Sequence, residues 1–87
     1  MPYIEPSRRK ILDKTIIKLQ ALLSDEGNNP GDYNYVMSLL IKKWFECRYN
    51  YRTIAEITGV LENVKQEFYR RHVLDYEDEK IKLNGDI

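Results

Sequence analysis

Apolar residues recur with helical spacing in three segments of this 87-residue chain. Steps of three and four residues place them on one side of a helix, and none of the segments alternates with the period of two typical of a strand. The pattern predicts an all-α protein with main helices at about residues 7–24, 33–48 and 51–73, the third being the longest. A short fourth helix is expected at about residues 75–83.

These helices are expected to form one small helical domain over residues 1–87. Residues 1–6 then form an N-terminal arm, and residues 84–87 form a C-terminal tail. A chain of this length hides only about 60% of the surface that it exposes when unfolded. One small core must therefore hold it together, or a partner must contribute.

Short polar residues predict where the helices begin and end. Ser7, Asp32, Asn50 and Asp75 stand where their side chains can accept hydrogen bonds from the first free N–H groups of the four helices. Gly85, after Asn84, suits a left-handed stop. Because no proline or glycine separates the third helix from the fourth, one unbroken helix is the alternative.

The second helix is apolar around most of its circumference. One face carries Tyr33, Val36, Met37, Leu40, Trp44 and Cys47, and other faces carry Tyr35, Leu39, Ile41 and Phe45. A helix of this kind is normally buried on more than one side. Three helices can scarcely supply that cover, so the pattern favours a homo-oligomer, with a dimer as the preferred form.

The third helix has one apolar stripe and one unusual glycine. The stripe, expected to lie in the core, consists of Ile54, Ile57, Val60, Leu61, Val64 and Phe68. Gly59 and Ala55 lie on another face, and glycine within a helix costs about 1 kcal/mol relative to alanine. Gly59 is either a tolerated surface residue or a place where another backbone approaches closely, from the N-terminal arm or from a second copy. The candidate interface is therefore Tyr35, Leu39 and Phe45 with Ala55, Gly59 and Tyr69.

Net charge, apolar run length and cysteine content indicate the compartment of the protein and the partners that it does not attract. Fourteen Lys and Arg residues balance fourteen Asp and Glu residues, so no overall field attracts nucleic acid or an anionic membrane. The longest apolar run, Val36–Ile41, is far shorter than the roughly 20 residues of a membrane span. The single Cys47, expected to be buried, suits a reducing compartment. We expect a cytoplasmic protein with no membrane contact.

Nucleic-acid binding is the second hypothesis. Arg48, Tyr49, Tyr51 and Arg52 combine cationic and stacking side chains in the short connection between the second and third helices. Single-strand binding proteins use this combination. The neutral net charge argues against it, because nucleic-acid-binding domains are usually basic.

Enzymatic activity has little support in the sequence, and no cofactor is expected. Glu56, Glu62, Glu67 and the acidic run 77–79 could gather around Mg²⁺ in a metal-dependent nucleotide hydrolase, which is the third hypothesis. Their spacing does not repeat at the three- or four-residue steps such sites use on facing helices. His72, the one histidine, ends a helix among arginines, where a charge-capping role explains it.

Four strings of the chain resemble a known family. They are Met1-Pro2-Tyr3-Ile4, Gly31-Asp32-Tyr33-Asn34-Tyr35, Gly59-Val60-Leu61-Glu62 followed by Glu67-Phe68-Tyr69-Arg70-Arg71, and Tyr76-Glu77-Asp78-Glu79-Lys80-Ile81 with Asn84-Gly85-Asp86. Together they are similar to a family of small proteins of unknown function found in tailed phages, prophages, bacteria and archaea. The resemblance implies a domain of unknown function with no assigned activity, so it brings no catalytic residues. The second helix is more apolar than three helices can cover. We therefore expect a non-enzymatic protein-interaction module that self-associates and acts as a phage-type accessory protein.

Overall fold

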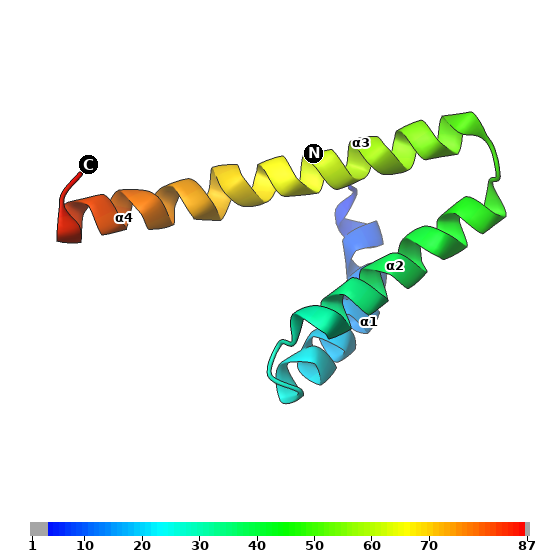
Figure 1. Cartoon of the computed structure of the whole chain (residues 1–87). Helices are drawn as coiled ribbons and strands as arrows, with labels where there is room; N and C mark the ends of the chain where they lie inside the picture. Colours follow the sequence, from blue (N-terminus) through cyan, green and yellow to red (C-terminus); the bar gives the residue numbers. More distant parts are fainter. Residues whose placement is uncertain (1–3, 87) are drawn as a thin grey trace. The chain divides into compact units, whose positions relative to one another are not determined.

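A computed structural model describes residues 4–86, which fold into long helices and contain no strand (Figure 1). The elements in chain order are α1 (Pro6–Asp25), α2 (Pro30–Cys47), α3 (Tyr51–Phe68), the π turn η1 (Tyr69–Val73) and α4 (Leu74–Asn84). The all-α prediction is confirmed. The chain divides into two compact units, Met1–Arg48 and Tyr49–Ile87. The prediction of one domain over residues 1–87 stays a prediction.

The first unit consists of α1, a four-residue loop and α2. The end of α1 is a Schellman motif: the Gly27 N–H donates to the Ser24 carbonyl and the Asn28 N–H to the Leu23 carbonyl, both at 2.9 Å. Gly27 and Asn28 have φ angles of 83° and 55°, in the left-handed region that glycine and asparagine tolerate best. These two residues stop the helix and reverse the chain.

Two predicted caps in the first unit are wrong. The cap position of α1 is Glu5, whose side chain makes no capping bond, and the helix begins at Pro6, so Ser7 already lies inside it. The cap of α2 is Asn29, whose Oδ1 accepts from the Gly31 N–H at 2.8 Å. Asp32 lies in the first turn instead. Proline at a first helical position loses no intrahelical hydrogen bond, so both helices begin earlier than their polar residues suggest.

The second unit begins at the predicted cap. Asn50 Oδ1 accepts hydrogen bonds from the Thr53 N–H at 2.9 Å and from the Thr53 hydroxyl at 3.2 Å. These two bonds satisfy a free backbone donor at the start of α3 and hold Thr53, which is buried with 1% of its surface exposed. The side chain of Asn50 therefore fixes where the long helix starts.

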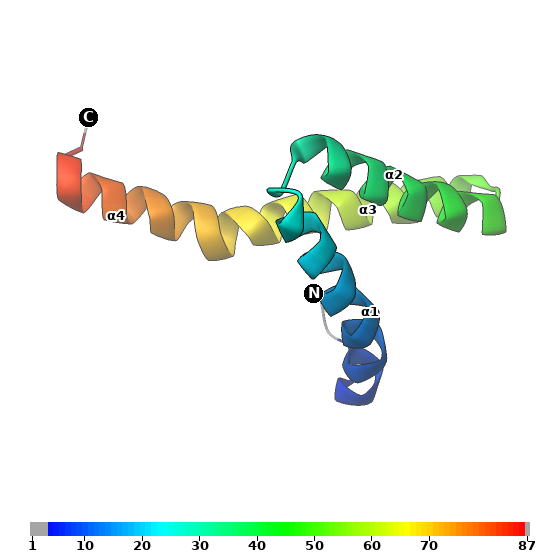
Figure 2. The same ribbon diagram turned by 90° about the horizontal axis from the view of Figure 1, so that it is seen from below.

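The helix of the second unit is unbroken from Tyr51 to Asn84, so the open alternative for the third and fourth helices is the observed one. The ribbon runs through η1 into α4 without a loop in both views (Figure 1, Figure 2). The predicted cap at Asp75 is therefore wrong, and Asp75 lies within the first turn of α4. Gly85, with φ 82°, ends the helix as predicted, and its N–H donates to the Ile81 carbonyl at 2.8 Å.

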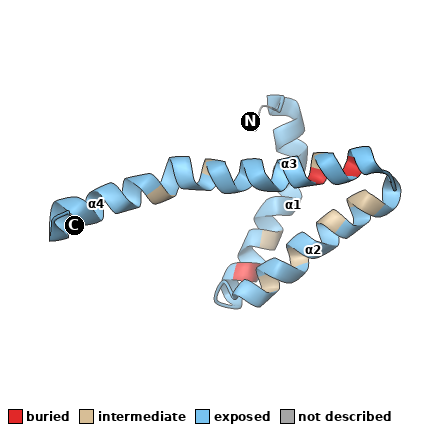
Figure 3. Ribbon diagram, turned by 45° about the horizontal axis from the view of Figure 1, so that its top comes forward, coloured by how far each residue is buried: buried red, intermediate tan, exposed pale blue. Residues whose placement is uncertain are grey.

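The core of the described chain is very small. Leu23 and Ile57, each 8% exposed, are its buried hydrophobic residues, and Figure 3 shows almost all other positions as exposed or half-buried. The prediction that the whole apolar stripe of α3 forms a core is wrong, since only Ile57 of that stripe is buried. Cys47, predicted to be buried, is exposed.

Candidate functional site

An exposed apolar stripe runs along α3. We call it the α3 stripe, and it consists of Ile54, Ile57, Val60, Leu61, Val64 and Phe68. Apart from Ile57, its side chains are between 41% and 56% exposed. They recur at steps of three and four residues, which gather them on one side of the helix. An amphipathic helix gains most of its stability from packing such a face against another surface, so the α3 stripe is a candidate contact surface.

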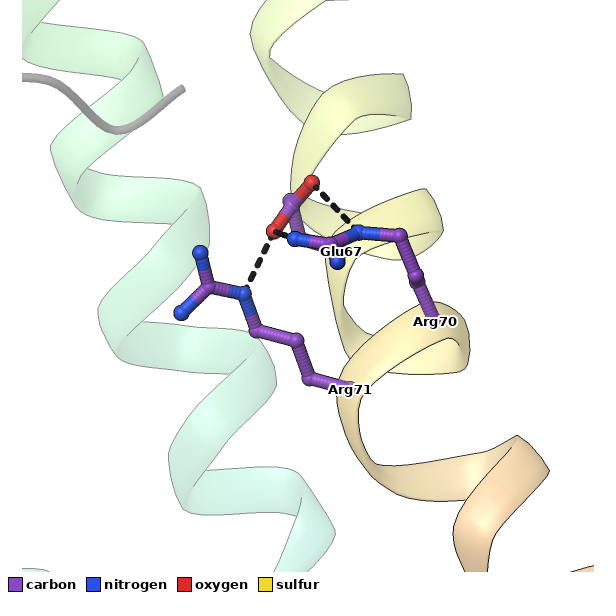
Figure 4. Close-up of polar contacts among 3 residues, drawn as sticks. All are labelled: Glu67, Arg70 and Arg71. Carbon is purple, nitrogen blue, oxygen red and sulfur yellow. Dashed lines mark hydrogen bonds and ion pairs between the residues drawn. The ribbon is translucent and has the colours of Figure 1, made fainter.

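Charged residues lie beside the C-terminal end of the α3 stripe. Glu67 accepts hydrogen bonds from Arg70 Nε at 3.3 Å and Nη2 at 2.9 Å, and from Arg71 Nε at 2.7 Å (Figure 4). The two bonds from Arg70 and, to a smaller extent, the bond from Arg71 hold the pKa of the Glu67 carboxyl below its ordinary value of 4.5. The same carboxylate raises the pKa of Arg70. This cluster stabilises the turn at which α3 enters η1.

Aromatic rings surround the same turn. The ring of Phe68 lies edge-on to Tyr69, with centroids 6.2 Å apart, and 5.9 Å from the ring of His72. Phe68 and Tyr69 are 56% and 51% exposed, so these contacts do not bury them. Beside the carboxylate cluster, these rings form an apolar surface that is partly exposed to water, as is common in tyrosine-rich interfaces.

The predicted interface residues of α2 lie on two sides of that helix. Tyr35 and Leu39, four residues apart, share one face and are 64% and 44% exposed. Phe45 is half-buried. Six residues separate it from Leu39, a spacing that turns it away from the face of the other two. The structure thus brings together Tyr35 and Leu39 but not Phe45.

The predicted interface residues of α3 and η1 are exposed. Ala55 and Gly59 lie one turn apart, and Tyr69 is 51% exposed. A methyl group built on Gly59 would meet no atom of the described residues within 4 Å. The close approach predicted there stays a prediction. The rest of the N-terminal arm, Met1–Tyr3, lies outside the described residues.

The four residues of the nucleic-acid hypothesis are all exposed. Tyr49 and Tyr51 are 82% and 89% exposed. Arg52 Nε lies 3.9 Å from Glu56 Oε2, a long ion pair at the surface. Arg48 ends the first unit, and the other three residues begin the second. The exposed rings of Tyr49 and Tyr51 are available for stacking.

Residues 4–86 contain neither a cluster of metal-binding side chains nor a helix that could span a membrane. This part of the chain holds no group of three or more His, Cys, Asp or Glu side chains placed to bind a metal ion. Glu62 accepts a hydrogen bond from Gln66 at 3.2 Å, and Glu67 binds two arginines. None of the helices within these residues is both long and apolar enough to pass through a bilayer.

Sequence reasoning missed five residues of the exposed surface, because it assigned them to a core. They are 41–56% exposed, and they are Ile54, Val60, Leu61, Val64 and Phe68. Helical periodicity shows which residues share a face but not whether the chain itself covers that face. The seven-residue interval between Leu61 and Phe68, which is typical of helices that pair with other helices, is the signal that could have identified them.

The comparisons with known proteins identify one family. Searches of curated proteins and of solved structures find no match for the chain. A family model described as "Domain of unknown function (DUF6899)" matches residues 1–87, which is the whole sequence. The chain therefore belongs to the DUF6899 family.

Proposed function

We propose that this chain is a non-enzymatic helical protein-interaction module that self-associates, with a dimer as its simplest form. The observation that carries the proposal is the exposure of the α3 stripe. Val64 and Phe68 are each 56% exposed on a helix whose unit contains no second helix to cover them. Full burial of one such side chain is worth about 1.5–3 kcal/mol. A second copy supplies that burial, and every copy in solution carries the same stripe.

The surfaces proposed to take part include the six residues predicted from the sequence. Tyr35 and Leu39 offer an exposed apolar face on α2. The open space beside Gly59 lets a second backbone approach α3 closely. Phe45, Ala55 and Tyr69 complete the set. These surfaces add contact area to the α3 stripe.

The setting of this function is also a proposal. Membership of the DUF6899 family, together with the strings Gly31–Tyr35 and Tyr76–Ile81, supports a phage- or prophage-type accessory role. The exposed thiol of Cys47 supports work in the cytoplasm, where free thiols stay reduced. The self-association does not depend on either point.

The molar mass in solution tests the proposal. Light scattering from about 1 µM to 1 mM should give about twice the chain mass of 10.4 kDa at the upper end, with a fall toward 10.4 kDa on dilution. A mass of 10.4 kDa at every concentration contradicts self-association. The Arg48→Ala variant should have the wild-type mass, because Arg48 lies on none of the proposed surfaces.

Nucleic-acid binding remains the second candidate because Tyr49 and Tyr51 are so fully exposed. Stacking of a base on an exposed ring contributes about 1–3 kcal/mol, and cations nearby make the binding salt-dependent. A gel shift with single-stranded DNA and RNA tests it. A salt-sensitive shift that Arg48→Ala and Arg52→Ala both abolish would favour this candidate over the interaction module.

A further inference from the structure

Large apolar side chains recur at a nearly fixed interval along the whole helix of the second unit. Ile54, Leu61 and Phe68 are seven residues apart, Tyr76 follows after eight, and Leu83 follows after seven more. All five are exposed, from 43% for Leu61 to 76% for Leu83. A seven-residue repeat keeps apolar side chains facing a neighbouring helix. The repeat therefore points to helix pairing.

The π turn explains the one interval of eight. Within η1 the Leu74 N–H donates to the Tyr69 carbonyl, five residues back instead of four, so this turn holds one extra residue. In an uninterrupted α-helix the extra residue would rotate Tyr76 and Leu83 by about 100° away from Phe68. The π turn absorbs it. The line of large side chains is thus continuous from α3 into α4.

Side-chain contacts show which neighbours share this line. The ring of His72 lies 5.9 Å from that of Phe68, and Lys80 Nζ lies 5.5 Å from the centre of the Tyr76 ring. Ile81 is 42% exposed but follows Tyr76 by five residues and lies on another face. We define the seam as the part of this line from Leu61 to Leu83, which consists of Leu61, Val64, Phe68, His72, Tyr76, Lys80 and Leu83. It is about 33 Å long at the rise of an α-helix.

Charges along the same helix select the orientation of a partner. The basic residues Arg70 and Arg71 precede an acidic run of Asp75, Glu77, Asp78 and Glu79. A parallel second copy in register would place each run against its own equivalent, and like charges repel. An antiparallel copy, related by a two-fold axis near His72, removes this repulsion and brings the basic run of each chain within about one turn of Asp75 of the other. His72 is also the midpoint of the seam.

The antiparallel register also matches the ends of the seam. It places Leu61 opposite Leu83 of the second copy and Phe68 opposite Tyr76 of the second copy. Charged residues on the same side of the seam then approach opposite charges: Lys65 lies within one turn of Glu77 of the second copy, and Arg71 lies within one turn of Asp75 of the second copy. The sequence of the seam is thus complementary to itself when reversed.

From this spacing, turn geometry and charge pattern we infer that the partner of the α3–α4 helix is the same helix of a second copy, packed antiparallel along the seam. The inference rests on the proposed self-association and adds its surface and orientation. The isologous arrangement covers both seams at once and leaves no apolar end for a third copy. It accounts for a helix of 34 residues whose large apolar side chains follow one line, with no second helix beside it in the described residues of its unit.

Distances between spin labels test the orientation. Cysteine replaces Thr58 or Asn84 in a Cys47→Ser background. Thr58 is exposed and its hydroxyl donates to the Ile54 carbonyl of its own helix, while Asn84 ends α4. The antiparallel pair predicts about 40 Å between two Thr58→Cys labels and about 35 Å between two Asn84→Cys labels. A mixture of the two variants should give a short distance, below about 20 Å.

Together, the mass and the distances distinguish failure of the proposed self-association from failure of the antiparallel seam. A mass of 10.4 kDa for the unlabelled wild type overturns the proposed self-association and this inference together. A dimer with short distances between like labels and a long distance in the mixture overturns the antiparallel orientation and leaves self-association intact. A dimer with long distances in all three samples overturns the seam as the contact surface. Equal masses of labelled and wild-type protein show that the labels leave the assembly unchanged.

Discussion

The helix α2 and the helix from α3 to α4 both expose apolar side chains, but in different arrangements. On α2, Tyr35, Met37, Leu39 and Leu40 are 44–66% exposed and point in several directions. On the second unit, the seam residues follow one line. Scattered apolar residues show that a helix needs cover without showing from where. A line of side chains specifies the axis along which a second helix can pack, and the second unit carries such a line.

Of the changes considered, a charge placed within the seam should weaken the dimer most. We expect Val64→Lys to weaken the dimer by about 30-fold or more, because it places a second ammonium group opposite Lys80 of the second copy within the contact. Sedimentation velocity measures the change. Asn63→Lys adds the same charge to the adjacent residue outside the seam and should leave the dimer nearly as strong as in the wild type. Equal weakening by the two variants would exclude the seam.

Single-residue deletions should separate the π turn from the rest of the helix. Deletion of Asn63 rotates Leu61 away from the later seam residues and should weaken the dimer about tenfold. Deletion of Arg71 removes the extra residue of η1 and leaves intervals of seven throughout, so the dimer should persist within about threefold. Sedimentation of both variants measures this contrast. Comparable losses from the two deletions would show that η1 does not set the register.

The caps of the two units allow a comparison at the level of stability. Asn29→Ala and Asn50→Ala each remove a side chain that accepts a backbone N–H, and each should lower the free energy of unfolding by about 1 kcal/mol. Asn50 also accepts from the buried Thr53, so its replacement should have the larger effect. Urea unfolding at fixed protein concentration measures both. Wild-type stability of the Asn50→Ala variant would refute the role of the cap, and Asn63→Ala is the control.

Replacement of Glu67 should have the smallest effect, and one that depends on pH. Because the pKa of Glu67 is lowered in the folded chain, its arginine contacts stabilise the fold fully above its ordinary value of 4.5. That contribution is lost as the pH falls through the lowered pKa. Glu67→Gln should therefore unfold slightly more easily than the wild type at pH 7, and the two should converge in acid. Thermal unfolding monitored by circular dichroism measures the difference. A gap that widens in acid would contradict this account.

The sequence predicts the helices well and the surfaces poorly. Asn50 and Gly85 mark the ends of the long helix because capping chemistry is local. Asp32 and Asp75 failed as caps because a proline begins α2 earlier and no break occurs before α4. The α3 stripe was assigned to a core because periodicity does not distinguish burial by the same chain from burial by another. The π turn depends on a backbone bond that residue types do not specify.

Amide hydrogen exchange of the wild type at two protein concentrations tests the central claim most directly, because it reports on residues 61–83 without a substitution. If a second copy covers the seam, amides of these residues exchange slowly in the concentrated sample and lose protection on dilution, as the helix opens in the free chain. Protection that is the same at both concentrations, while the mass falls from dimer to monomer between them, would contradict the claim.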